Sequence, residues 1–334
     1  MELDELHSRL VPFCREMYAN KAADVTDVTK MPGHAGFSFG FTVESAGSCE
    51  SWYIRLPPPG VKWQGTADVL RQVAVLNALD GGPVPHCSVR WSGDEPRWFG
   101  SPYFIVPKLH GDVVGLTSDG WVSRLDVETR RDMARQAMTA LAHVHEVDPN
   151  QASYLGSPIE FADDVVRWDR FVEKAADAQR LSLVPNVRKL LLDGIPTDAP
   201  IGIFHGDFQW ANLFYSLQGE LLAVIDWELV GIGATLNDVG WIATFNDPAA
   251  WAPGRNVGTV MPLADELIEM YAAALGRPVP DLNWYRALAA YKFAIITGFN
   301  LMLHRRGKRP DPSWEDTKHS IEPLLERAGA LLQG

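Results

Sequence analysis

The sequence predicts an α+β protein built in two parts. Segments with strand-like alternation gather in the first hundred residues, and segments with helical spacing dominate the remainder. A short β-rich stretch at 201–226 lies among those later helices. Strands and helices that are segregated along a chain are typical of the α+β class. We expect one part over 1–106 and the other over 107–334, with a hinge at about 106–111.

The first part is predicted to combine a small sheet with two helices. Apolar residues at helical spacing predict a helix over 3–18, and alternation around the turn at 46–48 predicts a hairpin over 36–56. A second helix is expected over 66–79, with Thr66 as its N-cap. Two further strands are expected near 87–91 and 102–106.

The second part is predicted to be larger and mostly helical. Its apolar spacing indicates a long helix over 124–146, followed by helices at about 160–180 and 184–193. After the β-rich stretch, helical patterns return at about 234–245, 262–275, 281–304 and 313–332.

Composition excludes several classes of protein. The 334 residues include 30 Lys and Arg against 42 Asp and Glu, a net charge of −12, and 46% are hydrophobic. This excludes intrinsic disorder and argues against binding nucleic acid through a general basic surface. Three cysteines are too few for a disulfide framework. Without an apparent signal peptide or an 18-residue apolar run, we expect a soluble cytoplasmic chain with no membrane partner. Its oligomeric state is not indicated.

The segment 203–233 carries the densest chemical signal. Asn212 precedes a predicted hairpin and Asp226 follows it. If the hairpin is centred near Gly219, these two residues lie directly across from one another, with their side chains converging. An amide oxygen and a carboxylate are hard ligands that suit Mg²⁺, which takes the rest of its shell from water and substrate phosphates.

Asp207 lies on the loop just before this hairpin. A carboxylate there could take the proton from a hydroxyl group while a metal ion neutralises phosphate charge, which is the division of labour in phosphoryl transfer. The pattern of His205 and Asp207, with Asn212 five residues later and Asp226 fourteen beyond that, is similar to the catalytic and metal-binding motifs of protein kinases. An isolated turn carboxylate is the alternative for Asp207, and a metal-dependent hydrolase is a weaker one for the segment.

The two blocks HGDFQWANLF and VIDWELVGIGATLNDVGWI resemble those of the aminoglycoside phosphotransferase/choline kinase superfamily. The sequence is similar to the broad phosphotransferase branch that also occurs as a region of some acyl-CoA dehydrogenases. The resemblance covers most of the chain and implies a bilobal, protein-kinase-like fold. Its small β-sheet lobe would bind the nucleotide, and its larger, mostly helical lobe would carry out catalysis and bind the acceptor.

The resemblance also implies a set of site residues. Asp207 would be the catalytic base, Asn212 and Asp226 would bind Mg²⁺, and His205 and Asp238 would hold the catalytic loop in shape. ATP is the implied nucleotide, with GTP possible. Its binding residues would be Gly33, Gly36 and Ser38 in the phosphate-covering loop, Arg55 in place of the phosphate-binding lysine, and the backbone of Val106 and Lys108 at the hinge.

The sequence departs from the family pattern at the partner of Arg55. Gln72 stands where the family has a glutamate, and Asp68, one turn earlier on the same helix, is a candidate replacement. Glu228 is open to two interpretations, as a second metal contact or as a carboxylate at the start of a helix. The phosphate loop also lacks the family's paired glycines.

These features predict an ATP-dependent kinase that phosphorylates a hydroxyl of a small molecule. The C-terminal tail is poor in acids, so we do not expect a polycationic aminoglycoside as acceptor. Two alternatives are a catalytically weak or inactive nucleotide-binding regulator and an antibiotic phosphotransferase. Aromatic residues are expected to line the acceptor site: Trp168, Phe171, Trp241, Phe245, Trp251, Trp284, Tyr291, Phe293 and Phe299.

Overall fold

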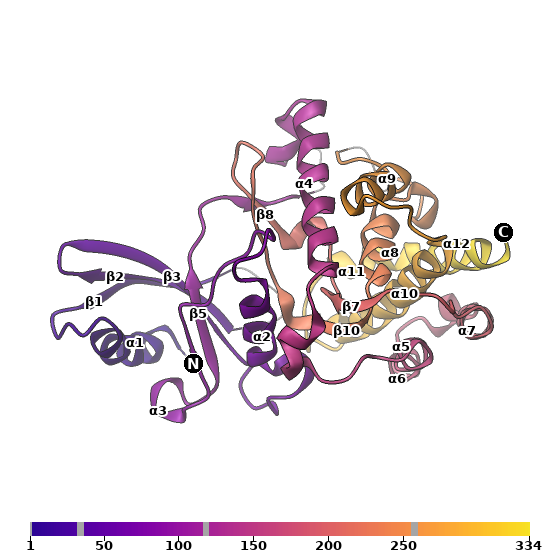
Figure 1. The fold of residues 1–334 in the computed structure, drawn as a ribbon. Helices are drawn as coiled ribbons and strands as arrows, with labels where there is room; N and C mark the ends of the chain where they lie inside the picture. Colours follow the sequence, from indigo (N-terminus) through magenta and orange to yellow (C-terminus); the bar gives the residue numbers. More distant parts are fainter. Residues whose placement is uncertain (1, 32–36, 116–119, 255–259) are drawn as a thin grey trace. The chain divides into compact units, whose positions relative to one another are not determined.

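The computed structural model describes residues 2–31, 37–115, 120–254 and 260–334. The chain divides into two compact units (Figure 1). Unit 1 comprises Met1–Gly111 together with two later segments, Asn150–Leu155 and Ile225–Val230, and unit 2 comprises the rest. The predicted α+β class, with a small sheet and a larger, mostly helical remainder, is confirmed.

Unit 1 is built around a five-stranded antiparallel sheet with the strand order β1-β2-β3-β5-β4. Helix α1 packs on one face of the sheet through Leu6, Leu10 and Phe13, which share a core with Phe39 and Ile54 (Figure 1). Each buried side chain of this size contributes roughly 1.5–3 kcal/mol. The elements are α1 (Leu3–Met17), β1 (Asp24–Lys30), β2 (Phe37–Ser45), β3 (Ser48–Leu56), α2 (Val69–Leu79), β4 (Trp91–Gly93), α3 (Pro96–Phe99) and β5 (Tyr103–Pro107).

Three details of unit 1 differ from the prediction. The N-cap of α2 is Asp68, whose side chain accepts from the Leu70 amide at 3.0 Å, whereas Thr66 lies in a preceding 3-10 turn. Strand β4 begins at Trp91 instead of residue 87. Strand β1 was not predicted, because it is an edge strand in which Val25 alone is buried, so it shows little alternation.

Unit 2 contains two small antiparallel sheets among its helices. One has the order β6-β8-β9 and the other pairs β7 with β10. The strands are β6 (Asp112–Val113), β7 (Ile201–Phe204), β8 (Leu213–Tyr215), β9 (Leu221–Val224) and β10 (Gly231–Ala234).

The β8–β9 hairpin forms as predicted, but its register differs. Tyr215 pairs with Leu221, which centres the turn on residue 218, and a bulge then brings Leu213 opposite Val224. The prediction that Asn212 and Asp226 are cross-strand partners is therefore wrong. Asn212 ends a 3-10 turn before β8, and Asp226 lies beyond the end of β9.

The helices of unit 2 pack around α10, which contacts α8 and α12 (Figure 1). A Cβ added at Gly240 of α8 would lie 2.6 Å from the Tyr285 backbone, so this glycine permits the close approach of the two helices. The region expected as one helix over 160–180 is broken into shorter pieces. The helices are α4 (Val127–His145), α5 (Phe161–Val166), α6 (Asp169–Val172), α7 (Val184–Asp193), α8 (Leu236–Phe245), α9 (Ala264–Leu275), α10 (Asn283–Arg305), α11 (Ser313–Thr317) and α12 (Ile321–Gln333).

Among the described residues, α10 is long and apolar enough to cross a membrane by length and composition alone. Most of its apolar stretch is buried inside the protein, however, with 61% of the 18-residue window covered. A buried core helix has the same composition, so this feature is weak support for a membrane span.

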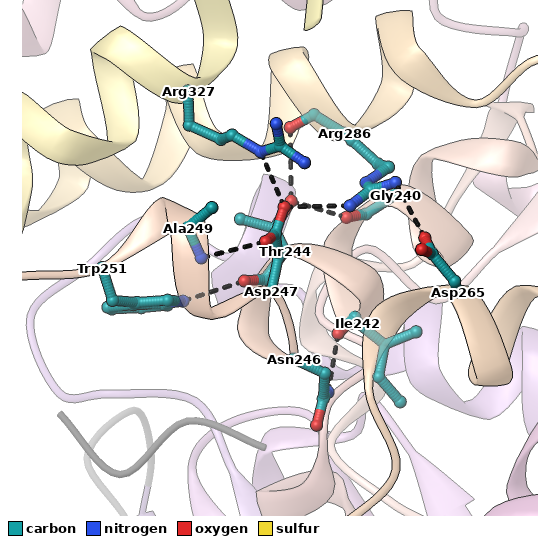
Figure 2. Close-up of polar contacts among 10 residues, drawn as sticks. All are labelled: Gly240, Ile242, Thr244, Asn246, Asp247, Ala249, Trp251, Asp265, Arg286 and Arg327. Carbon is teal, nitrogen blue, oxygen red and sulfur yellow. Dashed lines mark hydrogen bonds and ion pairs between the residues drawn. The ribbon is translucent and has the colours of Figure 1, made fainter.

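A largely buried ion-pair network joins four helices in unit 2 (Figure 2). Asp247, just beyond α8, accepts from Arg286 of α10 at 2.9 Å and from Arg327 of α12 at 2.8 Å. Arg286 also donates to Asp265 of α9 at 3.3 Å. Asp247 and Arg286 are almost fully buried, whereas the Asp265 side chain is 86% exposed.

We expect Asp247→Asn to lower the free energy of unfolding by about 3 kcal/mol, because it leaves the buried Arg286 without its nearest charge. Urea denaturation measures this loss. The matched control is Asp265→Asn, which removes an exposed partner of the same arginine and should cost less than about 1 kcal/mol. Equal losses in the two variants would show that burial of the Asp247 pair contributes nothing.

Candidate active site

One face of the unit 1 sheet gathers two of the predicted nucleotide-binding residues. Phe39 and Phe41 of β2 point into the core with α1, so Ser38, the residue before Phe39, faces the other way. Ser38 pairs with Arg55 across β2 and β3, which puts both side chains on this second face. Both are almost fully buried.

The Arg55 guanidinium is held by neighbours within unit 1. It donates to Ser38 Oγ at 3.1 Å and to Glu228 Oε2 at 2.7 Å, and it lies 3.7 Å from Asp226 Oδ1. Burial by itself lowers the pKa of Arg55, but the neighbouring Tyr53 and the two carboxylates outweigh it and keep the pKa above its usual value. Arg55 is thus a fixed, permanently charged donor.

Asp68, the candidate partner of Arg55, does not pair with it. Asp68 caps α2 and accepts a hydrogen bond from Tyr154 at 3.1 Å, and the carboxylate beside Arg55 is Glu228. Gln72 is buried, and its Nε2 has no hydrogen-bond partner among the described residues. Glu228 lies in the first turn of a 3-10 helix, Trp227–Leu229, which agrees with its interpretation as a carboxylate at the start of a helix. Its pairing with Arg55 spans 173 positions, and no local pattern signals a contact of that range.

Some backbone groups of the predicted hinge residues form hydrogen bonds within the unit 1 sheet. Val106 pairs with Tyr53 in the β3–β5 ladder, and the Lys108 amide donates to Ser51 O at 3.0 Å. The Lys108 ammonium lies 3.3 Å from where a Cβ on Gly40 would be, so it reaches across the same sheet face as Ser38. The predicted Gly33 and Gly36 lie outside the described residues.

Asp226 belongs to unit 1, through the segment Ile225–Val230. Its backbone is in the left-handed region with φ of +62°, which aspartate tolerates better than most residues. Its Oδ1 atom is buried without a hydrogen-bond donor among the described residues and has Arg55 at 3.7 Å. A buried carboxylate oxygen in this state fits a divalent cation such as the implied Mg²⁺.

In unit 2, the Asp207 carboxylate is aligned by three side-chain N–H groups. Oδ1 accepts from Gln209 Nε2 and Trp241 Nε1, both at 2.8 Å, and Oδ2 accepts from Asn212 Nδ2 at 3.0 Å. Burial raises the pKa of Asp207, while these donors and His205 oppose that rise. The result is a partly accessible carboxylate with a fixed orientation and a strengthened affinity for a proton.

The Asn212 amide has a defined orientation. Its Nδ2 also donates to the Asp207 backbone carbonyl at 2.8 Å, so both of its partners are oxygens that accept. The reverse orientation would place Asn212 Oδ1 against the two Asp207 oxygens, which cannot donate. In the observed orientation, Asn212 Oδ1 takes no part in these hydrogen bonds. That atom is a hard donor of the kind Mg²⁺ binds.

Asp238 holds the loop that carries Asp207. Its carboxylate accepts from the amides of His205 at 2.6 Å and Gly206 at 2.8 Å, and it lies 3.2 Å from His145 Nε2. Burial alone would raise the pKa of Asp238, but these partners hold it below its usual value. His205 Nδ1 in turn accepts from the Asp207 amide at 3.2 Å. The prediction that Asp238 and His205 shape this loop is confirmed.

The aromatic residues expected at one acceptor site form separate groups in unit 2. Trp241, Phe245, Trp251 and Phe293 contact one another. Trp168, Phe171 and Phe299 form a second group. Trp284 packs elsewhere, against Phe161 and Tyr285. Sequence reasoning missed Lys292, whose ammonium lies 5.5 Å from the ring centroids of both Trp168 and Trp241 and so joins the first two groups.

Curated relatives of this chain carry names of much longer proteins. Acyl-CoA dehydrogenase family member 11 of Gallus gallus is 25% identical over 298 residues, which cover 83% of this chain and 37% of that protein. A probable acyl-CoA dehydrogenase of Arabidopsis thaliana is 24% identical over 294 residues, covering 79% and 34% respectively. This chain therefore spans little more than a third of the length of these relatives.

Solved structures share the fold at low sequence identity. A putative aminoglycoside phosphotransferase of Ralstonia eutropha has a TM-score of 0.78 at 20% identity, covering 98% of both chains. A choline/ethanolamine kinase family protein of Mesorhizobium loti has a TM-score of 0.61 at 15% identity, covering 100% of both.

A family model decides the membership of this chain. The model of the phosphotransferase enzyme family, APH, matches residues 32–290, which include strands β2 to β5 of the unit 1 sheet, the Asp207 loop and Asp238. Because the match takes in well over half of the sequence, this protein belongs to the phosphotransferase enzyme family.

Proposed function

We propose that this protein is an ATP-dependent kinase that transfers the γ-phosphoryl group to a hydroxyl of a small molecule in the presence of Mg²⁺. The observation that carries this proposal is the Asp207 carboxylate, which three N–H donors hold in one orientation. Family membership supports phosphoryl transfer as the reaction class. A cytoplasmic location, which the sequence predicts, suits an enzyme that consumes ATP.

In this proposal Asp207 orients the acceptor hydroxyl and takes its proton. The hydroxyl oxygen forms a bond to the γ-phosphorus while the bond between that phosphorus and the β,γ-bridging oxygen breaks. The products are a phosphate monoester, ADP and one proton. Such a transfer depends mainly on positioning and charge stabilisation, which rigid donors supply. The fixed Asp207 carboxylate meets the positioning requirement.

The proposed nucleotide site lies on unit 1. Arg55 and Ser38 would bind phosphate oxygens, together with the backbone around Gly33 and Gly36. Val106 would offer backbone groups to the base, either adenine or guanine. The Lys108 amide is used by the sheet, so we assign Lys108 a phosphate-facing role through its ammonium.

The proposed metal ligands are Asn212 and Asp226, which precede and follow the β8–β9 hairpin in sequence. Both offer a side-chain oxygen that the hydrogen bonds described above do not use. Bound Mg²⁺ would neutralise phosphate charge. Asp226 also lies near Arg55, so the same carboxylate would balance a protein cation before metal binds.

Gln72 in place of a glutamate and the unusual phosphate loop, most of which lies outside the described residues, motivate the regulator alternative. Glu228 at 2.7 Å from Arg55 supplies the missing carboxylate and removes the argument from Gln72. No described observation favours the hydrolase alternative. The kinase is tested with ATP and Mg²⁺ against a panel of alcohols, sugars, hydroxy acids, amino alcohols and aminoglycosides, read by release of ADP. ATP binding without acceptor-dependent release of ADP from any of them would contradict it.

We expect Asp207→Asn to lower kcat by at least about 100-fold, because an amide cannot take the hydroxyl proton. Initial rates of ADP release with the best acceptor measure this. The matched control is Asp193→Asn, which removes a surface carboxylate and should leave the rate unchanged. ATP affinity confirms that the Asp207 variant is folded. A variant that keeps more than a tenth of the wild-type kcat would end the assignment of Asp207 as base.

We expect Glu228→Gln to weaken ATP binding about tenfold, equivalent to about 1.4 kcal/mol, because Arg55 loses the charged partner that orients it. Calorimetric titration with ATP and Mg²⁺ measures this. Asp68→Asn is the control, since asparagine can still cap α2 and Asp68 does not pair with Arg55. The reverse ranking of the two variants would restore Asp68 as the functional carboxylate.

A further inference from the structure

Lys292 is a buried cation to which the proposed reaction assigns no role. It lies on α10 in unit 2 with 8% of its surface exposed. Its ammonium lies 5.5 Å from the ring centroids of Trp168 and Trp241, so two indole faces flank it. Among the described residues it forms no hydrogen bond, and the nearest carboxylate oxygen is Asp164 Oδ2 at 3.9 Å.

Lys292 shares its nearest carboxylate with a second cation. Asp164 Oδ1 lies 2.7 Å from Arg167, and Oδ2 accepts from Asn237 at 3.1 Å. One carboxylate is therefore shared by two cations, and the closer of the two is Arg167. Burial lowers the pKa of Lys292, and the carboxylates of Asp164, Asp238 and Asp207 oppose this. A buried ammonium without hydrogen bonds is costly to the fold, so its retention calls for a role.

A second unsatisfied donor belongs to the same cluster. The Trp168 Nε1 atom is buried and has no hydrogen-bond partner among the described residues. Buried indole N–H groups normally find an acceptor. An N–H donor without an acceptor, beside an ammonium that lacks a close counter-ion, is complementary to an anion that carries several oxygen acceptors.

Trp241 connects this cluster to the proposed base. Its indole N–H donates to Asp207 Oδ1 at 2.8 Å, and its ring face lies against the Lys292 ammonium. Asp207 also acts electrostatically on Lys292. One aromatic side chain thus contacts both the reacting carboxylate and the buried cation, so a molecule anchored at Lys292 would reach the carboxylate with a short spacer.

We propose that Lys292, with the indoles of Trp168 and Trp241, forms the acceptor subsite for an anionic group, and that the acceptor is a small hydroxylated organic anion. The proposal rests on the proposed kinase function and names its substrate class. The anionic group binds Lys292 while the hydroxyl, a few carbons away, faces Asp207. The same positive charge repels polycationic sugars.

The test uses chemically matched probes on the full chain. Hydroxycarboxylates of two to six carbons are compared with neutral diols and with cationic amino alcohols of the same length, and glycerol phosphate represents the phosphate monoesters. Binding is measured by calorimetry without nucleotide, and turnover by release of ADP with ATP and Mg²⁺. We expect the anions to bind at least about tenfold more tightly than the neutral probes, equivalent to about 1.4 kcal/mol. The carboxylate and phosphate arms identify which anion is preferred.

The preference should depend on the Lys292 charge. We expect Lys292→Met to abolish it and Lys292→Arg to retain most of it. Methionine has a similar length, and replacing a buried charge with an apolar group of similar volume is often tolerated. The matched control is Lys189→Met, which removes an exposed lysine from the same unit and should leave the preference intact. If Lys292→Met fails to fold, the comparison of anionic with neutral probes on the wild-type protein still decides.

Two outcomes overturn the subsite. Equal binding of anions and neutral probes to the wild-type protein would do so, and so would a preference that survives in Lys292→Met. Failure of the kinase function gives a different result: anions would still bind through Lys292, but no acceptor would release ADP. Phosphorylation of neutral probes in preference to anions would support the kinase and refute the subsite.

Discussion

A buried carboxylate, Asp238, anchors the loop on which the rest of the candidate site depends. It accepts hydrogen bonds from the backbone amides of His205 and Gly206. These bonds fix the path of the chain from the end of β7 to Asp207. The turn requires Gly206 at φ of +88°, which a residue with a Cβ adopts only with strain. His145 contributes from α4, and its other ring nitrogen lies 2.7 Å from the Tyr271 hydroxyl, so two more helices support the same point.

The two carboxylates of this loop region have opposite environments. Asp238 accepts backbone amides beside two histidines, and its pKa is held below the usual value. Asp207 is also buried, but its hydrogen-bond donors and His205 do not outweigh that burial, so its pKa is raised. Neighbouring acids whose pKa values are pushed apart by their surroundings commonly divide their roles, one structural and one chemical. This separation supports Asp207 as the group that exchanges a proton and Asp238 as the group that holds it in position.

Trp241 contacts both Asp207 and Lys292. It is one of the three donors that orient Asp207, and its ring forms one wall beside Lys292. Acceptor binding and base orientation would then share one rigid side chain. Its helix is closely packed against α10 at Gly240, and the Asp247 network fixes the end of that helix, so the indole has little freedom to move.

The sequence by itself determined the fold class and the hairpin after Asp207, because these follow from local periodicity and turn signals. The loop-holding role of Asp238 followed from the resemblance of its sequence block to a known family. Only the tertiary structure decided the carboxylate beside Arg55, the exact register near Asn212 and the position of Lys292. These depend on contacts between distant segments and on a single bulge, and neither leaves a periodic signal in the chain.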